Sequence, residues 1–93
     1  MGIKKFTFEK QEIEGLQVIT PFTAEDHRGA FRKMFEKNIF RENGIEFEVA
    51  EMMTSVSKKG VVRGLHMQHT CPQAKLVRVE CGEVYDVAVD IRK

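Results

Sequence analysis

Short segments in which apolar and polar residues alternate are the feature that most constrains the fold of this chain. Leu16, Val18 and Thr20 alternate with polar neighbours, and Pro21 follows where a central strand could not continue. Glycine turn signals, such as Lys58-Lys59-Gly60, separate such segments. The pattern predicts an all-β sandwich or barrel built from short strands.

The order of these signals along the chain predicts six or seven strands and one helix. Strands are expected near residues 6–8, 16–20, 29–35, 47–57, 61–67, 74–81 and 84–91. Between Glu36 and Asn43, the apolar pair Ile39 and Phe40 precedes Asn43-Gly44, a pattern typical of a short helix that ends at a glycine. We therefore expect residues 1–93 to form a single, mainly β domain with one short helix.

Composition excludes several classes of protein. The chain has 93 residues, of which 42% are hydrophobic and 31% charged, and this balance indicates a soluble globular domain. A formal net charge of +1 favours neither a nucleic acid nor a membrane surface as partner. No signal peptide or membrane-spanning run is apparent, so Cys71 and Cys81 are expected to be reduced thiols in a cytoplasmic protein.

Three basic residues interrupt the apolar sequence between residues 61 and 79. Arg63, His66 and Lys75 lie among valines and leucines, where a strand that served only a core would carry another β-branched residue. Burying such groups is unfavourable without a partner or ligand. The pattern therefore predicts a pocket for an anionic ligand, with His66 as a group that titrates near neutral pH.

Several separated motifs resemble the dTDP-4-dehydrorhamnose 3,5-epimerase family. They are Asp26-His27-Arg28-Gly29-Ala30-Phe31, Arg63-Gly64-Leu65-His66, Lys75-Leu76-Val77-Arg78-Val79 and the run from Gly82 to Lys93. The motifs occur in the family's order and match its N-terminal half. The resemblance implies an isomerase that acts on a nucleotide-linked 4-keto-6-deoxy sugar in deoxysugar and surface-polysaccharide biosynthesis. It also implies a cupin-type jelly roll, which we expect to be incomplete in this chain.

The resemblance assigns roles to five residues. His66 takes the place of the base that removes a proton next to the ketone, a task suited to imidazole at neutral pH. Lys75 takes the place of the lysine that stabilises the enolate oxygen. Arg28 and Arg63 correspond to the arginines that bind the diphosphate, and Phe31 corresponds to an aromatic residue near the nucleotide base. No cofactor is implied.

A metal site is weighed separately because cupins often hold one. Gly60, His66 and Gly82 fit the spacing of the usual cupin motif. Gln68, however, stands where the second histidine is needed, and His69 lies one residue late, on the opposite face of a continuing strand. One imidazole does not make a site, so no metal is expected.

Departures from the family pattern leave the ligand open. Lys33 replaces the usual glutamate, and Glu51-Met52-Met53 replaces Gln-Asp-Asn, so the nucleotide base and the exact sugar are not determined. A non-catalytic sugar-nucleotide-binding remnant and a nucleotide-sugar keto-isomerase remain alternatives. We expect Met52, Met53, Met67 and Tyr85 to be core residues, while Asp86 is either near the pocket or solvated.

Two further expectations follow from the match to half of the family's length. A half barrel leaves strand edges open, which favours a homodimer. The family's proton-donating tyrosine lies in its second half. We therefore expect this chain to exchange the C3 or C5 proton with solvent faster than it inverts the centre, and we expect its inversion to be slower than that of a full-length relative by about 10²–10⁴-fold.

Overall fold

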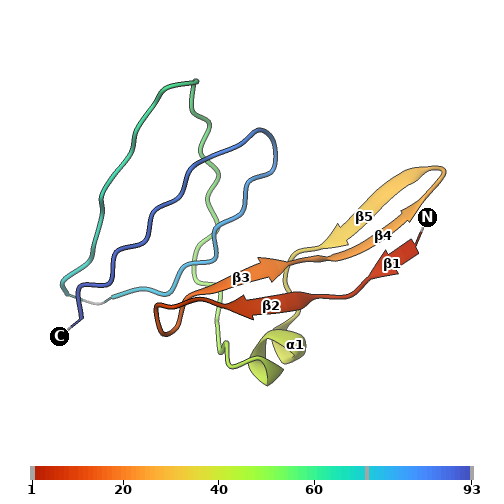
Figure 1. The fold of residues 1–93 in the computed structure, drawn as a ribbon, viewed down its shortest axis with the longest axis horizontal. Helices are drawn as coiled ribbons and strands as arrows, with labels where there is room; N and C mark the ends of the chain where they lie inside the picture. Colours follow the sequence, from red (N-terminus) through yellow and green to blue (C-terminus); the bar gives the residue numbers. More distant parts are fainter. Residues whose placement is uncertain (1, 71, 93) are drawn as a thin grey trace. The chain divides into compact units, whose positions relative to one another are not determined.

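The fold is described from a computed structural model that covers residues 2–70 and 72–92. The elements in chain order are β1 (Gly2–Lys4), β2 (Thr7–Lys10), β3 (Gln17–Thr20), β4 (Phe22–Asp26), β5 (Gly29–Lys33) and α1 (Lys37–Glu42). The regular elements among the described residues are thus mostly short strands, with one short helix (Figure 1), which is consistent with the predicted all-β class. They divide into two compact units. The N-terminal unit is Met1–Phe47 with Val89–Lys93, and the central unit is Glu48–Ala88.

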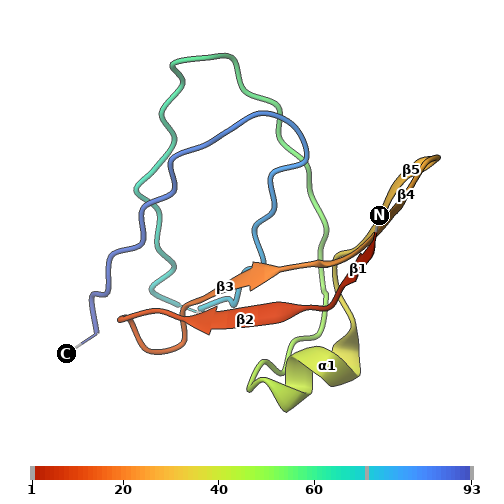
Figure 2. The same cartoon turned by 45° about the vertical axis from the view of Figure 1, so that its right-hand side comes forward.

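Two antiparallel sheets form in the N-terminal unit. β4 lies between β1 and β5 in a three-stranded sheet, and β2 pairs with β3 in a second sheet. In the turned view of Figure 2, β4 and β5 are seen almost edge-on. The register places Ile3, Ala24 and Phe31 in one row across the three strands. Residues that pair directly across a sheet point to the same face, so these three side chains share one face.

The boundaries of these strands follow the local signals in the sequence. Gly15, at φ 89°, lies in the turn between β2 and β3, where the Gln11 backbone N–H donates to the Leu16 carbonyl at 3.0 Å. β3 ends at Thr20, directly before Pro21, which has no N–H to donate to a ladder. The predicted strand end before Pro21 is therefore confirmed.

The predicted helix is also confirmed, and its ends show why it stops. Glu36 is the N-cap, and its carboxylate accepts a hydrogen bond from the Ile39 backbone N–H at 2.6 Å. At the other end, Asn43 Nδ2 donates to the Ile39 carbonyl at 2.8 Å. Gly44 follows at φ 82°, which is the left-handed conformation that commonly ends a helix.

Phe40 of α1 is the centre of the N-terminal unit's core. Its side chain is only 1% exposed, and no other hydrophobic residue is fully buried among the described residues. Ring centroids of Phe6, Phe8 and Phe35 lie 5.6, 5.2 and 4.7 Å from that of Phe40, all with edge-to-face geometry. These contacts hold α1 alongside the strand β2, as both Figure 1 and Figure 2 show.

The central unit is organised differently. The structure assigns no helix or strand to the described part of Glu48–Ala88, which runs as long segments joined by turns (Figure 1). In the predicted turn Lys58-Lys59-Gly60, Gly60 has φ 87° and the Val61 backbone N–H donates to the Lys58 carbonyl at 3.3 Å. The strands expected at 47–57, 61–67, 74–81 and 84–91 were therefore wrong, because their described residues form no hydrogen-bonded ladder.

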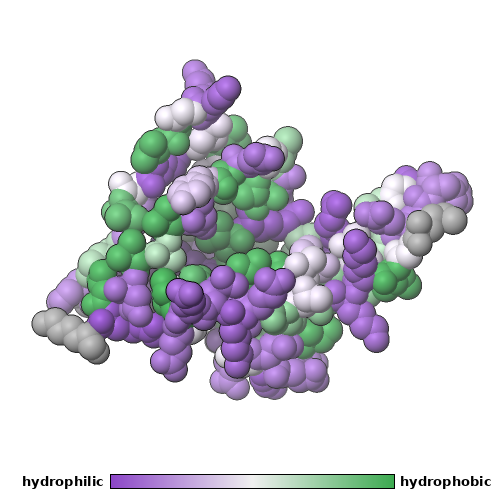
Figure 3. Space-filling view, viewed as in Figure 1, coloured by the Kyte–Doolittle hydropathy of each residue, from purple (hydrophilic) through white to green (hydrophobic). Residues whose placement is uncertain are grey.

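The core expected in this region was also wrong. Met52, Met53 and Tyr85 are 88%, 85% and 95% exposed, and Met67 is exposed as well. Figure 3 shows apolar side chains, in green, at the molecular surface among the charged ones. Apolar residues become buried only when a second layer lies on them. Every described residue of the central unit is exposed, so no such layer covers them.

Residues 1–93 as a single domain remains a prediction, because the two compact units are each described by themselves. Within residues 2–70 and 72–92, no helix is long and apolar enough to cross a bilayer.

Candidate functional site

Arg28 lies in the two-residue turn between β4 and β5, and its guanidinium forms an ion pair with Asp26. The Asp26 carboxylate accepts the Arg28 backbone N–H at 2.8 Å, Nε at 3.1 Å and Nη2 at 2.6 Å. The Arg28 side chain is still 80% exposed. The sequence showed Arg28 but not this partner. An aspartate two residues before an arginine at a turn is the signal that could have identified it.

The pairing changes the titration of both groups. The side-chain hydrogen bond from Arg28, followed by its backbone N–H, lowers the pKa of the Asp26 carboxyl. The same carboxylate raises the pKa of Arg28. The charge of Arg28 is therefore locally compensated, and a phosphate bound there would share the guanidinium with Asp26.

Phe31 presents an open aromatic surface near the same turn. It lies on β5 opposite Ala24 and is 62% exposed, so its ring is available to a ligand or to another chain. Two residues further on, Lys33 Nζ lies 5.6 Å from the ring centroid of Phe22, its cross-strand partner. The lysine that departs from the family's glutamate is thus held by a cation–π contact.

Arg63 has a different environment from Arg28. Its Nε donates to Ser57 Oγ at 2.9 Å. The four ion pairs found among the described residues involve Arg28, Arg41, Arg78 and Arg92, and Arg63 is not among them. Arg63 therefore keeps an uncompensated positive charge within the described part of the chain. Sequence reasoning missed Ser57 because its contact with Arg63 forms only across the Lys58–Gly60 turn.

His66 lies two residues after Gly64, close to the position that a side chain on that glycine would occupy. Gly64 has φ 109°, and a Cβ built there would stand 3.5 Å from His66 Nδ1 and 3.6 Å from the His66 backbone nitrogen. The imidazole therefore lies against the Gly64 backbone. A glycine is needed here because other residues rarely adopt this φ. The glycine of the Arg-Gly-Leu-His motif is therefore required by its backbone conformation, and a side chain there would be in ordinary van der Waals contact with the imidazole.

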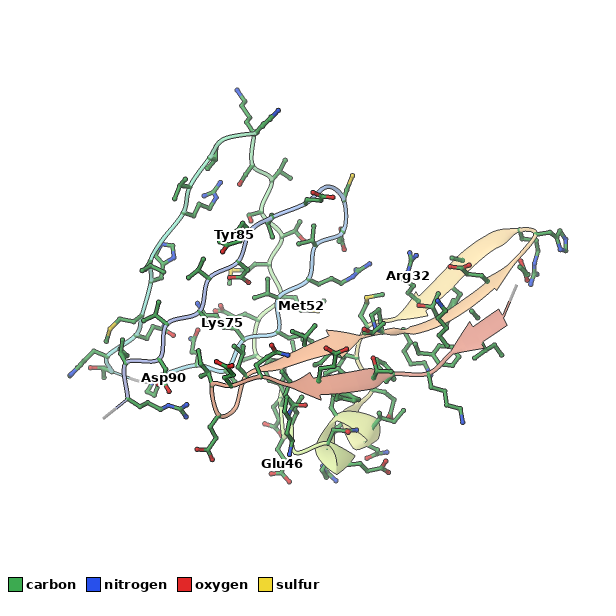
Figure 4. The ribbon with its side chains drawn as sticks, in the orientation of Figure 1. Arg32, Glu46, Met52, Lys75, Tyr85 and Asp90 are labelled. Carbon is green, nitrogen blue, oxygen red and sulfur yellow. The ribbon has the colours of Figure 1, made fainter. Side chains whose placement is uncertain are left out.

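Lys75 completes the set of predicted site residues. It is exposed, and Figure 4 labels it together with Met52 and Tyr85, which come from two other segments of the central unit. Among the described residues, no hydrogen bond or ion pair joins Arg63, His66 and Lys75 to one another. Their convergence on a common ligand is therefore still a prediction, as are the roles of Arg28 and Phe31.

The residue types that commonly bind metal ions bear on the site, as do the two cysteines. In the part of the chain that the structure describes, no three His, Cys, Asp or Glu side chains come together as candidate metal ligands. Cys81 is an exposed free cysteine, whereas Cys71 lies outside the described residues. The absence of a cofactor remains a prediction.

Comparison with known proteins identifies relatives over almost the whole chain. The family model for dTDP-4-dehydrorhamnose 3,5-epimerase matches residues 10–93. A dTDP-4-dehydrorhamnose 3,5-epimerase of Methanothermobacter thermautotrophicus is 47% identical over 89 residues, which are 96% of this chain and 48% of that protein. The enzyme of the same name from Shigella flexneri is 45% identical over 86 residues, 90% of this chain and 48% of the relative.

A third relative carries a different name. A dTDP-4-dehydrorhamnose 3-epimerase of Streptomyces niveus is 43% identical over 82 residues, covering 86% of this chain and 40% of that protein. The chain thus spans about half the length, or less, of these relatives. No solved structure matches it. The family match, which includes both the Arg63–His66 motif and Lys75, shows that the chain belongs to the dTDP-4-dehydrorhamnose 3,5-epimerase family.

Proposed function

We propose that the chain is the N-terminal part of an epimerase acting on a nucleotide-linked 4-keto-6-deoxy sugar. The observation that carries this proposal is the family match over residues 10–93, at up to 47% identity to proteins named as such epimerases. The exposed His66 and the uncompensated Arg63 support it, since a base and an anion ligand must both be open to the substrate.

In this proposal, His66 begins the reaction by removing a proton from carbon next to the 4-ketone. The electron pair moves onto O4 and forms an enolate, which the Lys75 ammonium stabilises more strongly than the ketone. A proton then returns to the carbon from the opposite face, which inverts the centre. His66 accounts for the first transfer, and a separate acid accounts for the second.

Substrate binding is assigned to the remaining predicted residues. Arg63 and Arg28 bind diphosphate oxygens through their forked N–H groups. Phe31 contacts the nucleotide base with its exposed ring. Because Arg28 is paired with Asp26 and Arg63 is not, Arg63 contributes the larger share of the binding.

A deuterium-exchange experiment tests the reaction. The protein is incubated with dTDP-4-dehydrorhamnose in heavy water, and the sugar is read by NMR. Deuterium at both C3 and C5 supports a 3,5-epimerase. Deuterium at C3 alone favours either a 3-epimerase, as the Streptomyces niveus relative is named, or a keto-isomerase, and a ketone signal that moves away from C4 identifies the latter. Binding of the nucleotide sugar without exchange identifies a non-catalytic binding remnant.

Two variants assign the roles within that experiment. His66→Asn removes the base and is expected to abolish exchange, whereas Lys75→Ala removes enolate stabilisation and lowers the rate by about 10²–10³-fold. Lys58→Ala, a change of an exposed lysine at the turn, is the matched control and should leave exchange unchanged. Exchange that survives in His66→Asn would place the base elsewhere.

We also propose a cupin-type jelly roll and a cytoplasmic homodimer that exchanges N-terminal strands. The antiparallel short strands support the fold, and β1, as the edge of its sheet with an exposed Ile3, supports the exchange. Light scattering at micromolar concentration tests the assembly, and a stable monomer would contradict it. Deleting Gly2–Lys4 should then shift the dimer toward monomer.

A further inference from the structure

The hydrogen bond between Ser57 and Arg63 spans a turn and holds one edge of the guanidinium. The two residues flank Lys58–Gly60, where the Val61 backbone N–H donates to the Lys58 carbonyl at 3.3 Å. Across this turn, Arg63 Nε donates to Ser57 Oγ at 2.9 Å. The Lys58–Gly60 turn therefore brings the Ser57 hydroxyl within hydrogen-bonding distance of Arg63.

The chemistry of this contact differs from that of an ion pair. A hydroxyl accepts the Nε proton without a counter-charge, so it orients the planar group but leaves the positive charge available. The Nε position is occupied, and the four N–H groups on the two Nη atoms are left to point at a ligand. By contrast, the Asp26 carboxylate takes both Nε and Nη2 of Arg28 and compensates its charge.

We propose that Ser57 is a positioning residue that aims the Nη edge of Arg63 at phosphate oxygens of the substrate. This inference rests on the proposed function, because it names the residue that prepares Arg63 for the diphosphate. Fixing the guanidinium before the ligand arrives reduces the side-chain entropy lost on binding. Ser57 itself does not touch the ligand.

The effect is expected in ligand affinity and not in stability. Ser57→Ala should weaken binding of dTDP about two- to tenfold, the range of a single hydrogen bond. Ser57→Thr keeps the hydroxyl and should restore the affinity. The matched control is Ser55→Ala, because Ser55 is also exposed and makes no hydrogen bond to Arg63 among the described residues.

Calorimetric titration with dTDP, and separately with inorganic pyrophosphate, tests this inference. The Ser57→Ala effect should vanish in an Arg63→Ala background, which a merely structural role of Ser57 would not produce. The Arg63 Nε–H resonance should also shift in Ser57→Ala and not in Ser55→Ala. Circular dichroism confirms that each variant keeps the fold.

The outcomes separate this inference from the proposed function. Wild-type binding of dTDP with no change in Ser57→Ala overturns the role of Ser57 and leaves the function standing. Binding of pyrophosphate but not of dTDP, with the Ser57 dependence intact, supports the role of Ser57 and contradicts nucleotide recognition. Binding of neither ligand overturns the inference, while deuterium exchange with dTDP-4-dehydrorhamnose still tests the function independently.

Discussion

The N-terminal unit and the central unit are each stabilised internally by a different kind of interaction. Paired strands and the aromatic cluster around Phe40 stabilise the N-terminal unit, through burial that is worth several kcal/mol. In the central unit, every described residue is exposed, and the interactions are local, such as the Ser57–Arg63 bond. Yet this unit contains Arg63, His66 and Lys75. The stable part and the part with most of the candidate chemistry are thus separate in this chain.

Arg63, His66 and Lys75 lie in the unit whose described interactions are individually weak. Local hydrogen bonds on exposed groups are each worth about 1 kcal/mol, far less than a buried aromatic side chain. The conformation of the central unit is therefore expected to respond to ligands, pH and single substitutions more readily than that of the N-terminal unit. Four predictions test the difference between the units, from the largest expected effect to the smallest.

Phe40→Ala should have the largest effect, lowering the free energy of unfolding of the N-terminal unit by about 3–5 kcal/mol. It removes the ring that contacts Phe6, Phe8 and Phe35. Urea denaturation followed by amide hydrogen exchange measures the loss unit by unit. Phe31→Ala is the control, because that ring is 62% exposed and its removal should change the free energy by no more than about 0.5 kcal/mol. Equal effects of the two substitutions would show that the aromatic cluster around Phe40 does not stabilise the N-terminal unit.

Gly64→Ala should disturb the central unit alone, by about 1–3 kcal/mol, because alanine is strained at φ 109°. The added methyl group would be in van der Waals contact with His66 Nδ1, at 3.5 Å, so the His66 ring should report the change in backbone conformation. NMR resonances of the His66 ring and amide exchange of residues 61–67 report the change. Gly60→Asn is the control, since asparagine tolerates the φ of 87° in that turn. An unchanged His66 spectrum in Gly64→Ala would show that the ring does not rest on Gly64.

Acid should weaken the exposed contact between Asp90 and Arg92 in the N-terminal unit. Asp90 accepts hydrogen bonds from the Arg92 side chain and backbone N–H, which lower the pKa of the carboxyl from 3.8 to about 2. Arg92 in turn donates to the Glu14 carbonyl at 2.7 Å. Because the folded-state pKa is lowered, the stabilisation is fully present above about pH 4 and is lost as the pH falls through about 2.

NMR titration of the Asp90 carboxyl carbon measures this directly. Arg92→Gln removes the charge and should return the Asp90 pKa toward 3.8. Arg78→Gln is the matched control, because Arg78 pairs with Glu80 instead. A titration midpoint near 3.8 in the wild type would show that Asp90 and Arg92 do not pair in solution.

Lys33→Met should have the smallest effect, lowering the free energy of unfolding by about 0.5–1 kcal/mol. It removes the ammonium that lies 5.6 Å from the Phe22 ring while retaining a side chain of similar length. Thermal unfolding measures the change, and Lys10→Met on β2 is the control without an aromatic partner among the described residues. A stabilising effect of Lys33→Met would show that the contact with Phe22 does not stabilise the folded chain.

Short-range features of this protein were determined by the sequence alone. The helix between Glu36 and Gly44, the strand end at Pro21 and the turn at Lys58–Gly60 were all predicted correctly. Each depends on backbone conformations and hydrogen bonds within a few residues, which local sequence specifies. The family was also evident from its ordered motifs, and the match over residues 10–93 confirms it.

Which apolar residues are buried and which charges are paired was decided only by the tertiary structure. Phe40 is buried while Met52 and Tyr85 are exposed, although all three lie in apolar patterns. Burial depends on whether another element lies on a side chain, and periodicity shows only which face is available. Likewise, Arg28 and Arg63 looked equivalent as anion ligands. The folded chain compensates one with Asp26 and only orients the other with Ser57, because each turn brings a different acceptor within hydrogen-bonding distance.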